Sequence, residues 1–223
     1  MLKIVKKDKQ YVIISKPLGI PSQPDPSGDA DAMSMTADLL REAGERSELW
    51  LVHRLDRTVG GLMVFARTKS AAAELSALAA SDGIEKLYLA VAEGNPCGGE
   101  YRDYIYKDAR LSKAFVVDSA RRGVKEAVLD CTPIAAANDR TLCKISLHTG
   151  RYHQIRVQMS SRGTPLVGDG KYGSRDKGAR TPALVAYSLA FTLGGKRIEA
   201  SILPDTAVYP WSLFEKELSQ KEF

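Results

Sequence analysis

The chain has 223 residues, of which 44% are hydrophobic and 26% charged, and its formal net charge is +5 with a pI near 9.0. This composition provides a sizeable core, and no apolar run approaches the roughly 18 residues that span a bilayer. Three cysteines without a CxxC spacing and an N-terminus without the apolar core of a signal peptide predict a cytoplasmic protein. The basic excess is typical of partners of nucleic acid, but also of many proteins without such a partner.

The first half of the chain predicts two strands and two helices. A short strand over 11–14 ends in the turn "SKPLG", and the Pro-, Gly- and Ser-rich residues 20–34 predict an exposed loop. Helical spacing over 35–43 predicts a helix that stops at Gly44. A buried strand is expected over 62–66. A second helix is expected over 70–80, with Thr68 or Ser70 as its N-cap.

The second half of the chain is richer in strands. Strands are expected over 86–94, 101–106, 114–117, 127–133, 141–148, 183–191 and 198–202, and helices over 153–163 and 211–218. Short hairpin-like links and irregularly placed helices favour an α+β fold, with a mostly antiparallel mixed sheet flanked by helices. No repeat or low-complexity linker interrupts residues 1–223, so we expect a single compact domain.

Three charged, glycine-containing stretches stand out: "HRLDRTVGG" over 53–61, "GRYHQIRVQMSSRGTPLVGDGKYG" over 150–173 and, more mildly, "KLYLAVAEG" over 86–94. Asp56 in the first stretch could be a turn residue that forms a surface ion pair with Arg54 or Arg57. It could instead be a carboxylate held ionised by an arginine, ready to act as nucleophile or base. Arg156, on a second stretch of the same unusual composition, favours the second interpretation.

These stretches resemble the motifs of the RluA-type pseudouridine synthases, which isomerise uridine in structured RNA. "HRLDRTVGG" is similar to the HRLD motif of the family, "KLYLAVAEG" over 86–94 to its K-x-Y-x-A segment, and residues 150–173 to its G-R-x-H-Q-I-R block. "ISKPLGIPSQP" over 14–24 looks like the K-P-x-G motif. The resemblance extends from about Tyr11 to Ile202 and implies a stand-alone catalytic domain, without the S4-like RNA-binding domain of many relatives.

The resemblance implies roles for individual residues. Asp56 would be the catalytic carboxylate, Arg156 its ion-pair partner, and Tyr88 the platform on which the target base stacks. Arg54 would fill the place that the flipped base leaves. Lys86 could contact phosphate, with a solvated strand-edge lysine as the alternative. Arg151 and His153 would orient their loop or contact RNA, with hydrogen bonding at the start of a helix as the alternative. His53 is a further candidate for substrate binding.

The reaction explains why these residue types are needed. Pseudouridine formation breaks the N1–C1′ bond, turns the uracil over and joins C5 to C1′, so an ionised carboxylate must lie near C1′ and C6. The residues do not choose between addition to the ring, capture of the sugar and removal of a sugar proton. A forked bond from an arginine opposes neutralisation of a buried carboxylate. Base flipping in turn requires an aromatic platform.

Other kinds of site are less well supported. His148 and His153 have no third ligand, so we expect no metal, and we expect no cofactor either. The segment "GDGKYG" lacks the spacing of a phosphate-binding loop, which leaves turn formation as the simpler role of Asp169. Lys16 and Arg162 are candidate phosphate contacts, with a solvated charge as the alternative for each.

The leading hypothesis is therefore an RNA pseudouridine synthase that acts on rRNA or tRNA as a monomer. An RNA-binding protein of the same fold without catalysis is the alternative, although it predicts damage at Asp56, Tyr88 or Arg156, and all three are intact. A sugar-bond hydrolase would require a second positioned carboxylate. Only Asp169 is available for that role.

Overall fold

The computed structural model describes residues 1–220, which form two compact units of interleaved chain segments. Unit 1 contains residues 1–86 and 186–202, and unit 2 contains residues 87–185 together with the segment that begins at Leu203. The division between them falls within two strands, β5 (Ile84–Glu93) and β10 (Leu184–Leu193). The expectation of a single domain over 1–223 stays a prediction, and its last three residues lie outside the described part of the chain.

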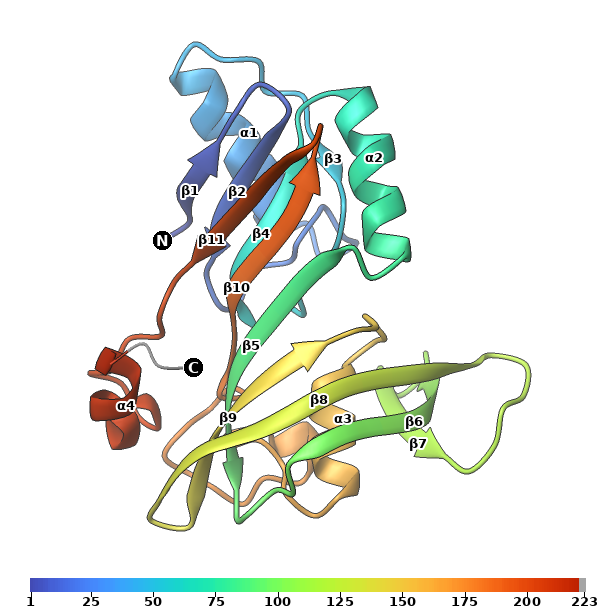
Figure 1. The fold of residues 1–223 in the computed structure, drawn as a ribbon, viewed down its shortest axis with the longest axis vertical. Coiled ribbons are helices and arrows are strands. Elements are labelled where there is room, and N and C mark those ends of the chain that lie inside the picture. The colour runs from blue at the N-terminus through green and yellow to red at the C-terminus, as the bar shows by residue number, and fades with distance from the viewer. Residues whose placement is uncertain (221–223) are drawn as a thin grey trace. The chain divides into compact units, whose positions relative to one another are not determined.

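Unit 1 contains strands with two helices beside them (Figure 1). Its elements are β1 (Lys3–Lys7), β2 (Tyr11–Lys16), α1 (Ala32–Glu42), β3 (Trp50–Leu51), β4 (Gly60–Ala66), α2 (Lys69–Ala80), most of β10, and β11 (Lys196–Ser201). The strand order is β1-β2-β4-β10, with β3 also beside β4 and β11 beside β10. The pairings β1–β2, β2–β4, β3–β4 and β10–β11 are antiparallel.

The core of unit 1 joins segments that are far apart in the sequence. Ile13 of β2 and Val64 of β4 share a buried cluster with Leu75 of α2 and with Phe191 and Ile198 of β10 and β11. The rings of Tyr11 and Phe191 meet edge to face at 5.8 Å. All seven residues of β4 are buried, so this strand is covered on both faces and positions the loop that precedes it.

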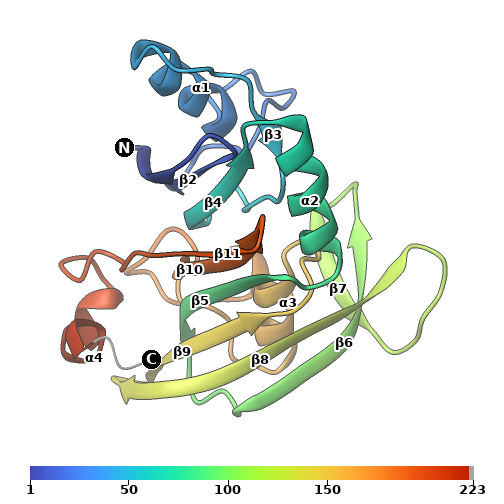
Figure 2. The ribbon, with the colours of Figure 1, turned by 45° about the horizontal axis from the view of Figure 1, so that its top comes forward.

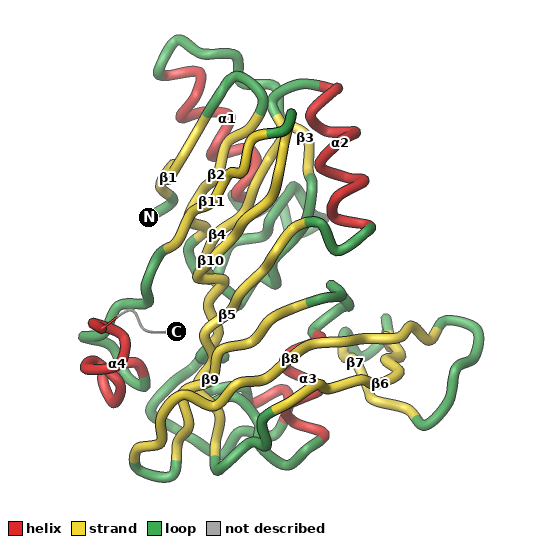
Figure 3. Tube along the Cα trace, in the orientation of Figure 1, coloured by secondary structure: helices red, strands yellow, loops and turns green. Residues whose placement is uncertain are grey.

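Unit 2 contains a second run of antiparallel strands. Its elements are β5, β6 (Gly99–Asp108), β7 (Lys113–Val117), β8 (Val124–Ala137), β9 (Arg140–Leu147), α3 (Gln154–Ser161), the short helix η1 (Gly170–Tyr172), and the C-terminal η2 (Trp211–Phe214) and α4 (Glu215–Gln220). The strand order is β5-β9-β8-β6-β7, with every pairing antiparallel. Figure 3 shows that more of this unit is strand than helix.

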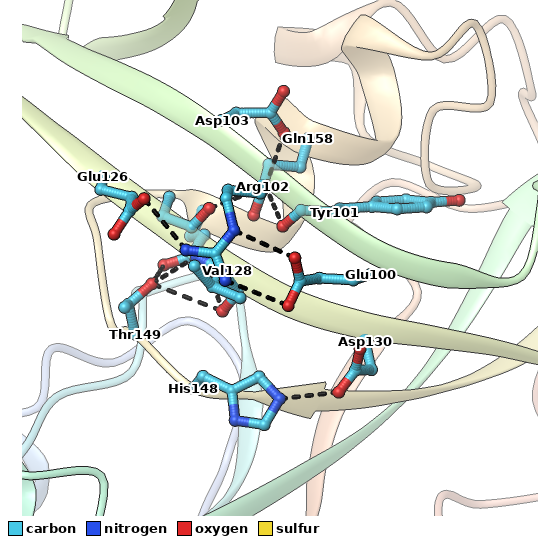
Figure 4. Close-up of polar contacts among 12 residues, drawn as sticks. Glu100, Tyr101, Arg102, Asp103, Glu126, Val128, Asp130, His148, Thr149 and Gln158 are labelled. Carbon is cyan, nitrogen blue, oxygen red and sulfur yellow. Dashed lines mark hydrogen bonds and ion pairs between the residues drawn. The ribbon is translucent and has the colours of Figure 1, made fainter. Parts of the chain in front are cut away.

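Helix α3 packs on the strands of unit 2, as Figure 2 shows. Val157 of α3 lies in a cluster with Ile105, Ala114, Ala127 and Tyr172. The fully buried amide of Gln158 donates to the Tyr101 carbonyl at 3.1 Å and to Asp103 Oδ2 at 2.6 Å (Figure 4). Figure 4 also shows that Arg102 of β6 forms an ion pair with Glu100 on the same strand and another with Glu126, which ties β6 to β8 beside this contact. Helix α3 is thereby fixed on its sheet.

The observed elements confirm the predicted α+β class and most of the predicted elements. Thr68 is the N-cap of α2, and the alternation over 141–148 is real, since Cys143, Ile145 and Leu147 are buried. The predicted loop over 20–34 is wrong at its end, because Asp31 caps α1 by accepting hydrogen bonds from the amides of residues 33 and 34. The mostly exposed β1 was not predicted, since its lysines hide any alternation.

None of the helices in residues 1–220 combines the length and the apolar character that crossing a bilayer requires. Within the same range, no three His, Cys, Asp or Glu side chains gather closely enough to hold a metal ion.

Candidate active site

The β3–β4 loop (residues 52–59) carries Asp56 and is held on both sides of this residue by the β2–α1 loop (residues 17–31). Ser22 Oγ donates to the Leu55 carbonyl at 2.8 Å and accepts from the Leu55 amide at 3.0 Å. The Gly19 amide donates to the Arg57 carbonyl at 2.8 Å, and Arg57 Nε donates to the Gly19 carbonyl at 2.8 Å. Both neighbours of Asp56 are therefore fixed, which restricts where its carboxylate can lie.

The loop returns to β4 through a glycine that no other residue can replace without strain. Gly61 has φ +123°, and a Cβ at this position would lie 2.4 Å from the carbonyl oxygen of Ala186 in β10. Such a distance is far below van der Waals contact. Gly61 therefore permits the close approach of two backbones just after the Asp56 loop.

The two arginines beside Asp56 behave differently from each other. Arg57 forms an ion pair with Asp29 in the β2–α1 loop. Arg54 is exposed, and its guanidinium forms no hydrogen bond or ion pair with any other residue in the range 1–220. The interpretation of Asp56 as half of a local surface ion pair and its interpretation as a catalytic carboxylate both stay predictions.

Lys16 is buried rather than solvated. Only 1% of it is exposed, and its ammonium donates to the carbonyls of Pro17 and Ile20 at 3.0 and 2.9 Å. Burial lowers the pKa of Lys16 to about 8, against the opposite effect of the Asp56 charge. The alternative of a solvated charge is therefore wrong for Lys16, which is a fixed positive group close enough to influence Asp56.

His53 is held in its neutral form by its surroundings. Its Nε2 accepts a hydrogen bond from the Val64 amide at 3.2 Å, and a protonated ring would present a second donor there. Burial first, and then the charge of Lys86, lower the pKa of His53 to about 4. His53 thus fastens the loop to β4, and its proposed contact with RNA stays a prediction.

Lys86 and Tyr88 lie on β5 and are both largely covered. The Lys86 side chain is 11% exposed, its ammonium lies 4.0 Å from Asp82, and burial lowers its pKa. Lys86 is therefore not the solvated strand-edge lysine of the alternative interpretation. Tyr88 is 5% exposed and stands opposite Ile145 of β9. Tyr88 belongs to unit 2, whereas Lys86 belongs to unit 1.

The residues that precede α3 form a tight polar turn in unit 2. Gln154 accepts from the Arg151 amide at 2.9 Å and from the Thr149 hydroxyl at 2.8 Å, and it donates to the Val128 carbonyl at 3.1 Å. The Arg151 guanidinium donates to the Glu126 carbonyl at 2.7 Å. These bonds support the alternative role that we gave Arg151 in its loop. Its contact with RNA stays a prediction.

His153 occupies a left-handed backbone conformation with φ +53° at the start of α3. Its ring stacks on Tyr152 at 3.8 Å, and its Nδ1 lies 2.9 Å from the Tyr172 hydroxyl. This hydroxyl accepts from the Ala114 amide at 2.8 Å, so it can donate its own proton to a neutral His153. Burial, followed by the charges of Arg156 and Lys171, lowers the pKa of His153 to about 3, in agreement with this arrangement.

Arg156 forms a forked, buried ion pair that the sequence did not reveal. Its Nε donates to Asp169 Oδ2 at 2.7 Å and its Nη2 to Asp169 Oδ1 at 2.8 Å, and the two side chains are 6% and 1% exposed. The simple turn role expected for Asp169 is therefore incomplete. The only hint in the sequence is that "GDGKYG" places an acidic residue beside turn glycines, which does not identify its partner.

The predicted site residues are thus divided between the units. Unit 1 carries His53, Arg54, Asp56 and Lys86, and unit 2 carries Tyr88, Arg151, His153 and Arg156. The pairing of Asp56 with Arg156 stays a prediction. Ser22 and Asp169, which hold the two ends of that proposed pair in place, were not among the predicted residues.

A comparison with models of protein families shows to which family the chain belongs. Residues 10–161 match the model of the family described as RNA pseudouridylate synthase. The chain belongs to this family. The matched segment contains Asp56, Tyr88 and Arg156, so the family assignment rests on the stretches that carry the predicted site.

Individual members of the family agree with this assignment. A ribosomal large subunit pseudouridine synthase D from Zymomonas mobilis is 34% identical over 197 residues, which are 85% of this chain and 61% of that protein. Its counterpart in Pseudomonas aeruginosa is 33% identical, with 86% of this chain and 59% of that protein covered. The chain thus spans about three fifths of the length of these relatives.

Solved structures show the same fold. The human RNA pseudouridylate synthase domain containing 4 matches with a TM-score of 0.76 at 22% identity, over 91% of this chain and 88% of that one. The human RNA pseudouridylate synthase domain containing 1 matches with a TM-score of 0.71 at 21% identity, over 95% and 86%. At these identities the match establishes the fold alone.

Proposed function

We propose that this chain is an RNA pseudouridine synthase that isomerises specific uridines in rRNA or tRNA, with Asp56 as its catalytic carboxylate. The observation that carries the proposal is the double attachment of the β3–β4 loop, which fixes both neighbours of Asp56 within a family whose members act on RNA. A catalytic group held in this way requires little reorganisation when substrate binds. The names of the relatives favour RNA of the large ribosomal subunit as the first RNA to test.

Asp56 acts near C1′ and C6 of the target uridine. The N1–C1′ bond breaks, the uracil turns over in the site, and the C5–C1′ bond forms. The C5 hydrogen leaves as a proton and N1 takes up a proton, so that the product is an isomer of uridine. The base stays bound throughout and no water attacks, so a single carboxylate is sufficient, in contrast to most glycoside hydrolases. The buried, positively charged Lys16 supports this role because it favours the ionised form of Asp56.

Three other residues serve the same reaction in this proposal. Arg156 donates to Asp56 and keeps it ionised, and Tyr88 stacks on the flipped base. Arg54 enters the place that the base leaves in the RNA, and its exposed guanidinium without an ion pair in residues 1–220 suits that role. His53, Lys86, Arg151 and His153 contact or orient the RNA-binding loops. The chain acts as a monomer and without a cofactor or metal.

The test is release of tritium from RNA that carries the label at C5 of uridine, because forming the C5–C1′ bond expels that hydrogen. The RNA is extracted from cells that lack this gene and is incubated with the wild type and with Asp56→Asn. Asp29→Asn is the matched control, since it removes a carboxylate that pairs with the residue next to Asp56. RNA binding is measured for all three proteins by gel shift.

We expect release by the wild type and by Asp29→Asn, and none by Asp56→Asn, with similar RNA binding by all three. Turnover by Asp56→Asn would refute the role of Asp56. No release by the wild type from RNA that it binds would instead favour an RNA-binding protein that has the fold without the chemistry.

A further inference from the structure

Asp169 and Arg156 form the most completely buried forked ion pair in the described part of unit 2. Two parallel hydrogen bonds of 2.7 and 2.8 Å join the carboxylate to the Nε and Nη2 side of the guanidinium. A fork of this kind fixes the plane and the rotation of the guanidinium, which a single contact would leave free to turn. Arg156 therefore has a defined orientation before any substrate arrives.

The backbone of Asp169 is itself firmly held. Val167, two residues earlier, donates to the Val91 carbonyl at 2.9 Å and accepts from the Ala183 amide at 2.8 Å. Gly168 has φ +79°, and a Cβ there would lie 2.3 Å from the Thr181 carbonyl oxygen, so the chain passes this point without a side chain. The Asp169 carbonyl then accepts from the amides of residues 172 and 174, at 2.9 and 3.1 Å.

The guanidinium of Arg156 is also supported from a second direction. Its central carbon lies 5.1 Å from the centre of the Tyr172 ring, an arrangement in which cation and ring attract each other. Tyr172 is 4% exposed and belongs to the cluster that holds α3 on its sheet. Carboxylate and ring together leave the guanidinium few alternative positions.

We propose that Asp169 is a positioning residue for pseudouridine formation, which orients Arg156 so that its other N–H groups meet the catalytic carboxylate. This inference rests on the proposed function. A guanidinium has five N–H donors, and the fork uses two of them. The remaining donors, on Nη1 and Nη2, are those through which Arg156 serves Asp56. Asp169 also balances the charge of Arg156, so that this cation can stay buried in the absence of RNA.

A second arginine–aspartate pair in the same unit provides a control, although here both nitrogens donate to one carboxylate oxygen. Arg140 donates from Nε and Nη2 to Asp176 Oδ2 at 3.2 and 2.7 Å, and Asp176 is similarly buried, with 5% of its side chain exposed. This pair contains none of the residues that we assign to the reaction. Asp176→Asn thus removes the charge of another largely buried aspartate that pairs with an arginine, without touching Arg156.

The experiment measures kcat and KM for tritium release by the wild type, Asp169→Asn and Asp176→Asn, together with the thermal midpoint of each. We expect kcat to fall about 100-fold in Asp169→Asn, because small misplacements of catalytic groups have effects of this order. We expect KM for RNA to stay within about threefold of the wild type, and kcat of Asp176→Asn to be close to that of the wild type at a similar thermal midpoint.

Asp169→Glu keeps the charge but moves the carboxylate by one methylene, and it tests the inference if Asp169→Asn does not fold. We expect it to lose kcat as well. A kcat close to that of the wild type in either folded Asp169 variant would refute the positioning role, and so would an equal loss in Asp176→Asn. In both cases an active wild type leaves the proposed function intact, whereas no release by the wild type refutes the two together.

Discussion

Replacing Gly61 with alanine tests the close approach of β4 and β10 that follows the Asp56 loop. The new Cβ would lie 2.4, 2.5 and 2.8 Å from the carbonyl oxygen, amide nitrogen and Cα of Ala186. These are backbone atoms in paired strands, so they cannot move aside as a flexible side chain could. The two strands must therefore separate locally. Alanine would in addition be strained at the φ of +123° that Gly61 adopts.

Gly99 isolates the steric part of this effect. Its φ is +120°, almost the same as that of Gly61, but a Cβ there would meet nothing within 4 Å. Backbone strain of this kind costs about 1–3 kcal/mol, and Gly99→Ala should lose only that. Overpacking adds about 1–3 kcal/mol, so Gly61→Ala should lose about 2 kcal/mol more than Gly99→Ala. Both substitutions lower the conformational entropy of the unfolded chain by the same amount, so this contribution cancels when the two variants are compared.

The measurement is the free energy of unfolding from guanidinium denaturation of the wild type and both variants, with the denaturant slope compared as a check on cooperativity. Gly61→Ala should also lower kcat for tritium release, because its backbone continues directly from the Asp56 loop, whereas Gly99→Ala should not. Equal losses of stability in the two variants would refute the reasoning, since they would show that Ala186 can move aside without cost.

Two further predictions concern charge. Since the pKa of His53 is about 4 in the folded chain and near 6.5 in the unfolded one, the unfolded state binds the proton first as the pH falls, and stability decreases from pH 6.5 to pH 4. At about 1.4 kcal/mol for each pKa unit, the loss relative to His53→Gln should reach at most about 3 kcal/mol in urea titrations, and parallel curves for the two proteins would contradict it. Arg156→Met should be inactive and should lose about 3–5 kcal/mol, because it leaves the Asp169 carboxylate buried without a partner. Adding Asp169→Leu should restore most of the stability but no tritium release, and an unchanged denaturation midpoint in Arg156→Met would show that the pair is not needed for folding.

The elements that could be predicted from the sequence are those whose pattern is local. The alternation over 141–148 and the capping threonine at Thr68 depend only on neighbouring residues, and both are confirmed. The exposed β1 could not be predicted in this way, because it is a strand only through its pairing with β2. Likewise the start of α1 depends on the cap at Asp31, which looked like one more acidic residue in a polar loop.

The site shows the same distinction between local and distant information. The motif that contains Asp56 could be recognised from the sequence, and so could the block that contains Arg156. The sequence did not show that Ser22 would form hydrogen bonds with the backbone of Leu55, 33 residues away. Nor did it show that Asp169 would form a two-bond ion pair with Arg156. A serine in a Pro-rich loop and an aspartate in a Gly-rich turn each have a sufficient local explanation, so nothing in the pattern points to the distant partner.

The interleaved make-up of the two units has a consequence for how the chain folds during its synthesis. The core of unit 1 needs Phe191 and Ile198, yet the strands that they cover are complete by residue 86. At the usual rate of about 5–20 residues per second, the intervening stretch of roughly 100 residues takes about 5–20 s to translate. During that interval β2 and β4 lack part of their cover on the nascent chain. A ribosome that pauses within unit 2 would prolong this exposure, so the speed of translation there affects the yield of folded protein.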